Sequence, residues 1–180
     1  MIRSSHIIVS TTIVSSALCL ASVPARDGVP ILFGTVIGAQ LPDIDHPKAE
    51  ISRITGPIGR FFSNHGHRCI THTLFALIPF VLLWLIIPTH TMGEYGMKMF
   101  TAGLLAGYLL HLIEDNFSRQ GVLWFYPFTH YETSAAGHQY KKRRFHNWYY
   151  TTGGKEEAII RNICLAFQVF LCYQLYTFWF

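Results

Sequence analysis

Long apolar stretches constrain this chain more than any other feature of its sequence. Five stand out, at about residues 7–23, 29–41, 70–88, 97–113 and 158–180. A helix needs about 20 apolar residues to cross the hydrocarbon of a bilayer. Only 13% of the residues are charged, against roughly 25% in an average soluble domain. The pattern predicts one all-α domain over residues 1–180, a polytopic membrane helical bundle with about five spans.

The individual stretches carry further structural signals. The first is rich in Ser and Thr, and the second is short. Gly34 and Gly38 in the second stretch, and Gly103 and Gly107 in the fourth, are each four residues apart. This spacing favours close helix packing in membranes. Pro79 predicts a kink in the third stretch, and the C-terminal YTFWF is typical of an interfacial anchor.

The lysines and arginines predict the orientation. With the N-terminus in the cytoplasm, the outer segments hold only Arg26 and Lys98 of the 14 Lys and Arg. The positive-inside rule therefore predicts an N-in, C-out, multi-pass protein of the bacterial inner membrane. One alternative stays open: Arg3, the first apolar run and the small residues before Arg26 also resemble a cleavable signal peptide. Cleavage would remove His6 and leave the other four spans oriented as before.

Residues 129–157 form a basic, aromatic-rich loop ahead of the C-terminal span at 158–180. Its KKRR run at 141–144 is predicted to lie near anionic headgroups, and an ordinary topogenic charge cluster is the simpler interpretation. His130, His138 and His146 could complete a metal site or contact headgroups. No ligand spacing links them, so a solvated loop is favoured. The four cysteines are scattered without a C-x-x-C pair, which indicates neither a disulfide framework nor a cysteine-built zinc site.

Histidines and aspartates gather at the cytoplasmic boundary of this topology. Acidic and imidazole groups at membrane depth are costly and are therefore functional candidates. Any one of them alone would be better explained as a helix cap or a headgroup contact, but a set drawn from four spans is harder to explain in that way. The set comprises His6, Asp43, Asp45, His46, His65, His67, His72, His111 and Asp115.

Two local spacings favour metal binding within this set. His111 and Asp115 are four residues apart on a helix and therefore share one face. Asp43 and Asp45 are two apart, so an extended segment would point both carboxylates the same way. Mixed imidazole and carboxylate ligation suits zinc, manganese or iron rather than calcium. The expected cofactor is a set of two or three divalent ions, with zinc favoured over manganese.

Three sequence blocks carry a resemblance to a known family. LPDIDHP, HRCITHT and GYLLHLIEDNFSRQGVLWFYPF occur in that order within a motif core at 6–128. They resemble the YdjM-like (DUF457) family of membrane-bound metal-dependent hydrolases, whose pattern is similar to zinc-dependent phospholipase C and P1 nuclease. Those enzymes hold a metal cluster in a helical bundle and cleave phosphoesters. The resemblance implies metal ligands at His6, Asp43, Asp45, His46, His67, His72, His111 and Asp115.

The chain departs from the family pattern at a few positions. Cys69 stands where the family usually has glycine, Thr73 replaces a commoner serine, and residues 116–118 vary a tract that often contains aspartate and threonine. None of these changes removes a candidate ligand. Cys69 could alter the approach of the backbone to a metal or add redox sensitivity.

The predicted reaction is phosphoester hydrolysis. A bound metal lowers the pKa of its water towards about 7. Asp43 or Asp45 would bridge metals or act as general base, and Arg68 would orient a phosphate in a bidentate manner. Arg68 and Arg119 are the predicted substrate-binding residues. A site near the inner leaflet predicts a phospholipid or lipid-linked phosphate as substrate, whereas nucleic acid is disfavoured because no known binding fold is recognisable.

Two other functions fit the same residues. A divalent-metal transporter or binding protein would need a polar path across the membrane, yet the opposite half offers little beyond His90, Thr91 and Glu94. A non-catalytic membrane factor would hold a structural metal whose coordination is closed by the protein. The sequence leaves the substrate, the metal and the oligomeric state open.

Overall fold

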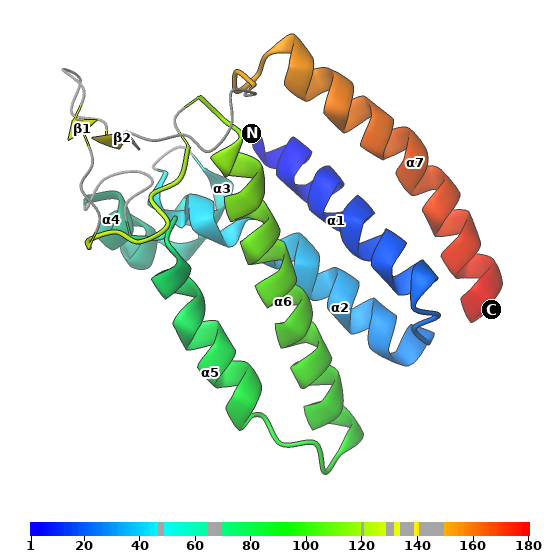
Figure 1. Ribbon diagram of the computed structural model, residues 1–180. Coiled ribbons are helices and arrows are strands. Elements are labelled where there is room, and N and C mark those ends of the chain that lie inside the picture. The colour runs from blue at the N-terminus through cyan, green and yellow to red at the C-terminus, as the bar shows by residue number, and fades with distance from the viewer. Residues whose placement is uncertain (47–48, 65–69, 120, 129–131, 134–138, 141–149) are drawn as a thin grey trace.

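The computed structural model describes residues 1–46, 49–64, 70–119, 121–128, 132–133, 139–140 and 150–180. These residues are almost entirely helical (Figure 1), which confirms the all-α class. The helices are α1 (Arg3–Leu20), α2 (Ala25–Gly38), η1 (Leu41–Asp45), α3 (Glu50–Thr55), α4 (Pro57–Asn64), η2 (Leu74–Leu77), α5 (Ile78–Ile86), α6 (Met92–Asn116) and α7 (Lys155–Trp179). The strands β1 (Glu132–Thr133) and β2 (Gln139–Tyr140) form a two-residue antiparallel pair.

The longest helices, α6 and α7, each have 25 residues. A capping box starts α6 five residues before the apolar stretch: the Thr91 hydroxyl accepts from the Glu94 amide, and the Glu94 carboxylate accepts from the Thr91 amide. Glu156 and Glu157 lie in the first turn of α7, where negative charge interacts favourably with the helix dipole.

Glycines let α2 and α6 pack backbone against backbone. A β-carbon at Gly34 or Gly38 would collide with the backbone of α6, and one at Gly103 or Gly107 would collide with the backbone of α2. Small residues at this spacing allow helices to approach closely where lipid replaces water. The packing predicted from the two glycine pairs is therefore confirmed.

Two helices in the described part of the chain, α6 and α7, are long and apolar enough to cross a membrane. Only 11% of the apolar part of α7 is buried within the protein, so most of this helix lies on the surface. The prediction of five such spans is wrong. Serine and threonine lower the hydropathy of the 18-residue α1, and α2 has only 14 residues. The third stretch is divided between η2 and the nine-residue α5. Pro79 lies in the first turn of α5 instead of kinking a longer helix.

The functional candidates meet at one end of the bundle. α1 contacts α7 on one side and α2 and α6 on the other, while α5 packs against α6 (Figure 1). The start of α1 meets the end of α2 through a hydrogen bond from Arg3 Nε to Gln40 Oε1 (2.7 Å). It meets the start of α7 through the Ile2 amide, which donates to Glu157 Oε1 (2.7 Å). These contacts bring residues from the two ends of the sequence together beside the end of α6.

Candidate metal centre

Three buried histidines from separate segments form the middle of the candidate centre. His6 lies near the start of α1, His111 near the end of α6, and His72 just before η2. The rings of His6 and His111 stack, with centroids 3.7 Å apart and an interplanar angle of 18°. His72 meets His111 edge-on, with centroids 5.4 Å apart. None of the three side chains is more than 1% exposed.

Asp115 lies among these imidazoles. Its Oδ1 is 3.4 Å from Nε2 of His6, and its Oδ2 is 3.7 Å from Nε2 of His72 and 3.9 Å from Nε2 of His111. Asp43 adds a second carboxylate, with Oδ1 3.8 Å from Nε2 of His111. These separations exceed a normal N–H···O hydrogen bond. Tetrahedral zinc ligands, each about 2.1 Å from the ion, lie about 3.4 Å from one another, so the spacing fits atoms that share a metal.

The protein orients two of the imidazoles through their other ring nitrogen. Nδ1 of His111 donates to the Ala39 carbonyl (2.8 Å). Nδ1 of His6 bonds Glu114 Oε2 (2.6 Å), and Ser10 donates to Glu114 Oε1 (2.8 Å). Metal-binding histidines are typically held in this way, with Nε2 left for the ion. Within the described residues, Nε2 of His6 and Nε2 of His111 have no hydrogen-bond partner.

The DIDH segment departs from the expected geometry. It does not form an extended strand, because η1 is a 3-10 turn with Pro42 near its start, where the fixed φ of proline favours a helical turn. Asp43 therefore faces His111, whereas Asp45 accepts a hydrogen bond from the Thr71 hydroxyl (2.6 Å) and lies 3.4 Å from Nδ1 of His72. Asp45 is 1% exposed. The two carboxylates thus face different neighbours, and Asp45 faces the ring nitrogen of His72 that points away from Asp115.

Two sets of atoms satisfy the geometry of a metal site. The first set comprises His6, His111 and Asp115; the second comprises Asp43, His72 and His111. In each set, the candidate ligand atoms lie within 4.8 Å of one another. We refer to these five residues as the metal centre.

Other predicted site residues lie apart from these sets or cannot be placed. His46 follows η1, is partly buried and belongs to neither set. Arg119 is exposed just beyond α6. Several predicted positions lie outside the described residues, namely His65, His67, Arg68 and Cys69 and, in the basic loop, the histidines at 130, 138 and 146 and the KKRR run.

Glu114 is the functional candidate that the sequence interpretation missed. It is 7% exposed and bonds both His6 and Ser10. A buried carboxylate within an apolar helix is as costly as its neighbour Asp115, so the same argument from membrane depth could have identified it. The N-terminal ammonium of Met1 also reaches the centre and donates to Asp115 Oδ1 (2.7 Å) and to the Tyr150 hydroxyl (3.1 Å).

The fold and the centre define a helical protein with two helices apolar enough to cross a membrane and a buried His/Asp cluster at one end. The family model described as "YdjM inner membrane protein" matches residues 1–179, and the chain belongs to this family of inner membrane proteins. The family resemblance read from the three sequence blocks is therefore confirmed. The further similarity to phospholipase C and P1 nuclease stays a prediction.

Individual relatives agree with this assignment. The chain is 32% identical over 117 residues to the uncharacterized protein YvsG of Bacillus subtilis (strain 168), an alignment that covers 63% of the chain and 68% of YvsG. It is 34% identical over 101 residues to the inner membrane protein YdjM of Escherichia coli (strain K12) and to that of Shigella flexneri. These alignments cover 54% of the chain and 49% of each YdjM protein, so the chain spans about half the length of these two relatives. No solved structure matches the chain.

Proposed function

We propose that this protein is a membrane-bound metal-dependent hydrolase that cleaves a phosphoester at the cytoplasmic face of the inner membrane. The observation that carries the proposal is the metal centre, in which three imidazoles and two carboxylates from four segments converge. The Nε2 atoms of His6 and His111 are buried there without a hydrogen-bond partner in the described chain. Burying such polar atoms is costly unless something binds them, and a divalent ion fits the donor set.

We propose that the centre binds two or three ions, and the number of ligand atoms limits how they can be held. Nδ1 of His111 donates to a carbonyl, so His111 has one nitrogen to offer and binds one ion. If two ions bind, His111 would serve one of them, and the other would be held by the remaining residues of the two sets, with Asp43 and Asp115 as the available carboxylates. Zinc is the favoured metal and manganese the alternative, because both accept mixed nitrogen and oxygen ligands.

The chain's own residues suggest separate roles in hydrolysis. A bound metal would supply a water of lowered pKa. The side chain of Asp43 is 21% exposed, so this is the carboxylate of the centre that water and substrate reach, and it is our candidate for the general base. Asp45 is buried against Thr71 and orients His72 in this proposal. Arg68 and Arg119 are proposed to bind the phosphate, Arg68 on the family pattern alone.

The distribution of charge supports a cytoplasmic location of the centre. Of the described lysines and arginines, all but Arg26 and Lys98 belong to segments at the end of the bundle that holds the centre. At the opposite end, Arg26 lies over the Tyr95 ring (5.2 Å) and Lys98 over the Trp84 ring (5.0 Å). The positive-inside rule then favours the N-in, C-out orientation, with α6 and α7 spanning the membrane. Since α1 supplies His6 and packs against three helices, we propose that it is retained and not cleaved.

A structural metal site is the second candidate function. His6, His72, His111 and Asp115 are each at most 1% exposed, and structural sites are typically closed by protein ligands. The bound ion would then stabilise the end of the bundle without activating a water.

Elemental mass spectrometry on detergent-purified protein tests the proposal. We expect two or more zinc or manganese ions per chain in the wild type and their loss in His111→Ala/Asp115→Ala. The matched control is His90→Ala, because His90 is exposed at the far end of the bundle. Protein that stays metal-free after purification without chelator and after attempted reconstitution refutes a metal site. If metal is bound, hydrolysis of bis-p-nitrophenyl phosphate that is lost in Asp43→Asn supports the hydrolase, and an inactive metal-bound protein supports the structural alternative.

A further inference from the structure

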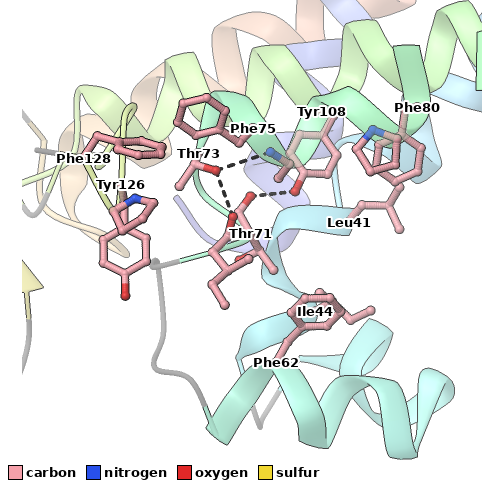
Figure 2. Close-up of a pocket in the computed structure, with 14 residues that line it drawn as sticks. Leu41, Ile44, Phe62, Thr71, Thr73, Phe75, Phe80, Tyr108, Tyr126 and Phe128 are labelled. Atoms are coloured by element: carbon pink, nitrogen blue, oxygen red, sulfur yellow. Dashed lines mark hydrogen bonds between the residues drawn. The ribbon is translucent and has the colours of Figure 1, made fainter. Parts of the chain in front are cut away.

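The protein contains an apolar cavity of about 710 Å³, and Figure 2 shows the residues that line it. Its walls come from η1, α4, residues 70–80, α6 and residues 126–128. Most of the lining is aromatic or aliphatic, including Leu41, Phe62, Phe80 and Phe128. The volume falls within the range of about 300–1,000 Å³ that is typical of small-molecule sites.

Three hydroxyl groups in the wall, those of Thr71, Thr73 and Tyr108, are hydrogen-bonded within the protein. Tyr108 donates to the Thr71 carbonyl (2.6 Å), and Thr71 in turn donates to Asp45 (2.6 Å). The Thr73 hydroxyl donates to the Ile70 carbonyl (3.0 Å) and accepts from a backbone amide (3.3 Å). A ligand with polar groups would find these atoms already bonded, so the cavity suits a hydrocarbon.

Residues next to those of the metal centre form part of the cavity wall, although none of the five residues of the centre lines the cavity. Thr71 lines the cavity, bonds Asp45 and directly precedes His72. Leu41 and Ile44, which also line it, lie on either side of Asp43 in η1. This wall is therefore the part of the cavity from which the head group of a bound molecule could reach Asp43 and Asp45.

The outer end of the cavity offers an apolar entrance. Phe75 and Phe128 line the cavity, and their rings meet edge-on with centroids 5.6 Å apart. They are 41% and 79% exposed. Two exposed aromatic rings beside an apolar helix, α5, form a route along which a chain could enter from the bilayer without crossing water.

We propose that this cavity binds the hydrocarbon chain of the substrate, and that the substrate is an amphiphile whose phosphoester lies next to a long alkyl, acyl or prenyl chain. The part concerning the phosphoester rests on the proposed function, whereas chain binding does not require catalysis. The cavity then selects substrates by their chain and the metal centre acts on their head.

Photolabelling of the full-length protein in lipid nanodiscs tests this inference. The probe is dodecyl phosphate with a diazirine at the far end of its chain, and labelled peptides are mapped by mass spectrometry. We expect labelling concentrated in residues 70–80 and 126–128. Ala76→Phe fills the cavity with a ring and should reduce this labelling at least fivefold. The control Ala166→Phe adds the same ring to the exposed surface of α7 and should leave it unchanged.

A second variant keeps the test decisive if Ala76→Phe fails to fold. Phe128→Ala removes a ring that is 79% exposed, so the fold should tolerate it, and the cavity labelling should again decrease. Labelling confined to the lipid-facing surfaces of α5 and α7, or equal in all variants, overturns the inference. Cavity labelling that persists in His111→Ala/Asp115→Ala supports chain binding even if the wild type neither binds metal nor hydrolyses a phosphoester. Failure of the inference and failure of the proposed function are therefore distinguishable.

Discussion

Glu114 offers the sharpest test of how the fold supports the metal centre. Its carboxylate lies 2.6 Å from Nδ1 of His6, on the opposite side of the ring from Asp115, and Ser10 holds its other oxygen. A charged acceptor at this position fixes the ring and directs Nε2 towards the centre. Glu114 is therefore expected to strengthen metal binding without contacting the metal.

The expected magnitude follows from what each substitution removes. Loss of a residue that positions a metal ligand typically reduces metal affinity by about 10–100-fold, or about 1.4–2.7 kcal/mol. Glu114→Gln keeps an oxygen that can accept from His6 but removes the charge, so we expect about a tenfold loss of zinc affinity. Glu114→Ala removes the carboxylate and leaves both His6 and Ser10 without this acceptor, so we expect a loss nearer 100-fold.

Competition titration with a zinc chelator measures these affinities on purified protein. The control is Glu94→Gln, the same change on the same helix, where the carboxylate caps the start of α6 far from the centre. It should leave the zinc affinity unchanged while slightly lowering the melting temperature. If Glu114→Gln and Glu114→Ala both bind zinc within twofold of the wild type, Glu114 does not position His6 and the reasoning is refuted.

Three further predictions concern packing, buried hydrogen bonding and orientation. Gly103→Ala should destabilise the protein by about 1–3 kcal/mol in thermal melts, because the added β-carbon meets the backbone of α2. The control Gly96→Ala adds a β-carbon with nothing within 4 Å and should be neutral or stabilising. Equal effects of the two substitutions would contradict backbone contact between the helices. Thr71→Val removes the 2.6 Å hydrogen bond to the buried Asp45 carboxylate. We expect it to lower the free energy of unfolding, measured by denaturant titration, by about 1–3 kcal/mol. An unchanged unfolding midpoint would argue against that bond. Single cysteines at two positions, placed in a variant that lacks the native cysteines, test the orientation with a membrane-impermeant maleimide. Arg119→Cys should react only in inverted vesicles, and Lys98→Cys should react only in intact spheroplasts. The reverse pattern would exclude the N-in orientation.

Hydrophobicity and glycine spacing predicted the parts of the fold that depend on local sequence. The stretches at 97–113 and 158–180 became α6 and α7, because each combines length, high apolar content and a recognisable start. The glycine pairs predicted that both stretches would pack closely against another helix, and the structure adds that α2 and α6 are the partners. The prediction of a single kinked helix over the third stretch was wrong, because apolarity alone does not reveal that Pro79 lies in the first turn of a new helix.

The candidate site could be predicted in composition but not in geometry. His111 and Asp115 followed from helical spacing, and their partners from the shared membrane boundary. The opposite orientations of Asp43 and Asp45 depend on the 3-10 turn of η1, whose form is set by tertiary contacts as well as by Pro42. The link between Glu114 and His6 spans 108 positions in the sequence, and no local pattern identifies such a contact.

The polar face of α1 connects the packing of the bundle to its chemistry. Ser5, Ser10 and Ser15 are all fully buried, although serine in an apolar helix suggests exposure to water. α1 packs against α2, α6 and α7, so neighbouring protein shields these hydroxyls from lipid. Ser10 bonds Glu114, and Ser15 accepts a hydrogen bond from the Gln168 amide (3.1 Å). Two of the residues that lower the hydropathy of α1, Ser10 and Ser15, thus bond it to neighbouring helices, and Ser10 acts through Glu114 on His6.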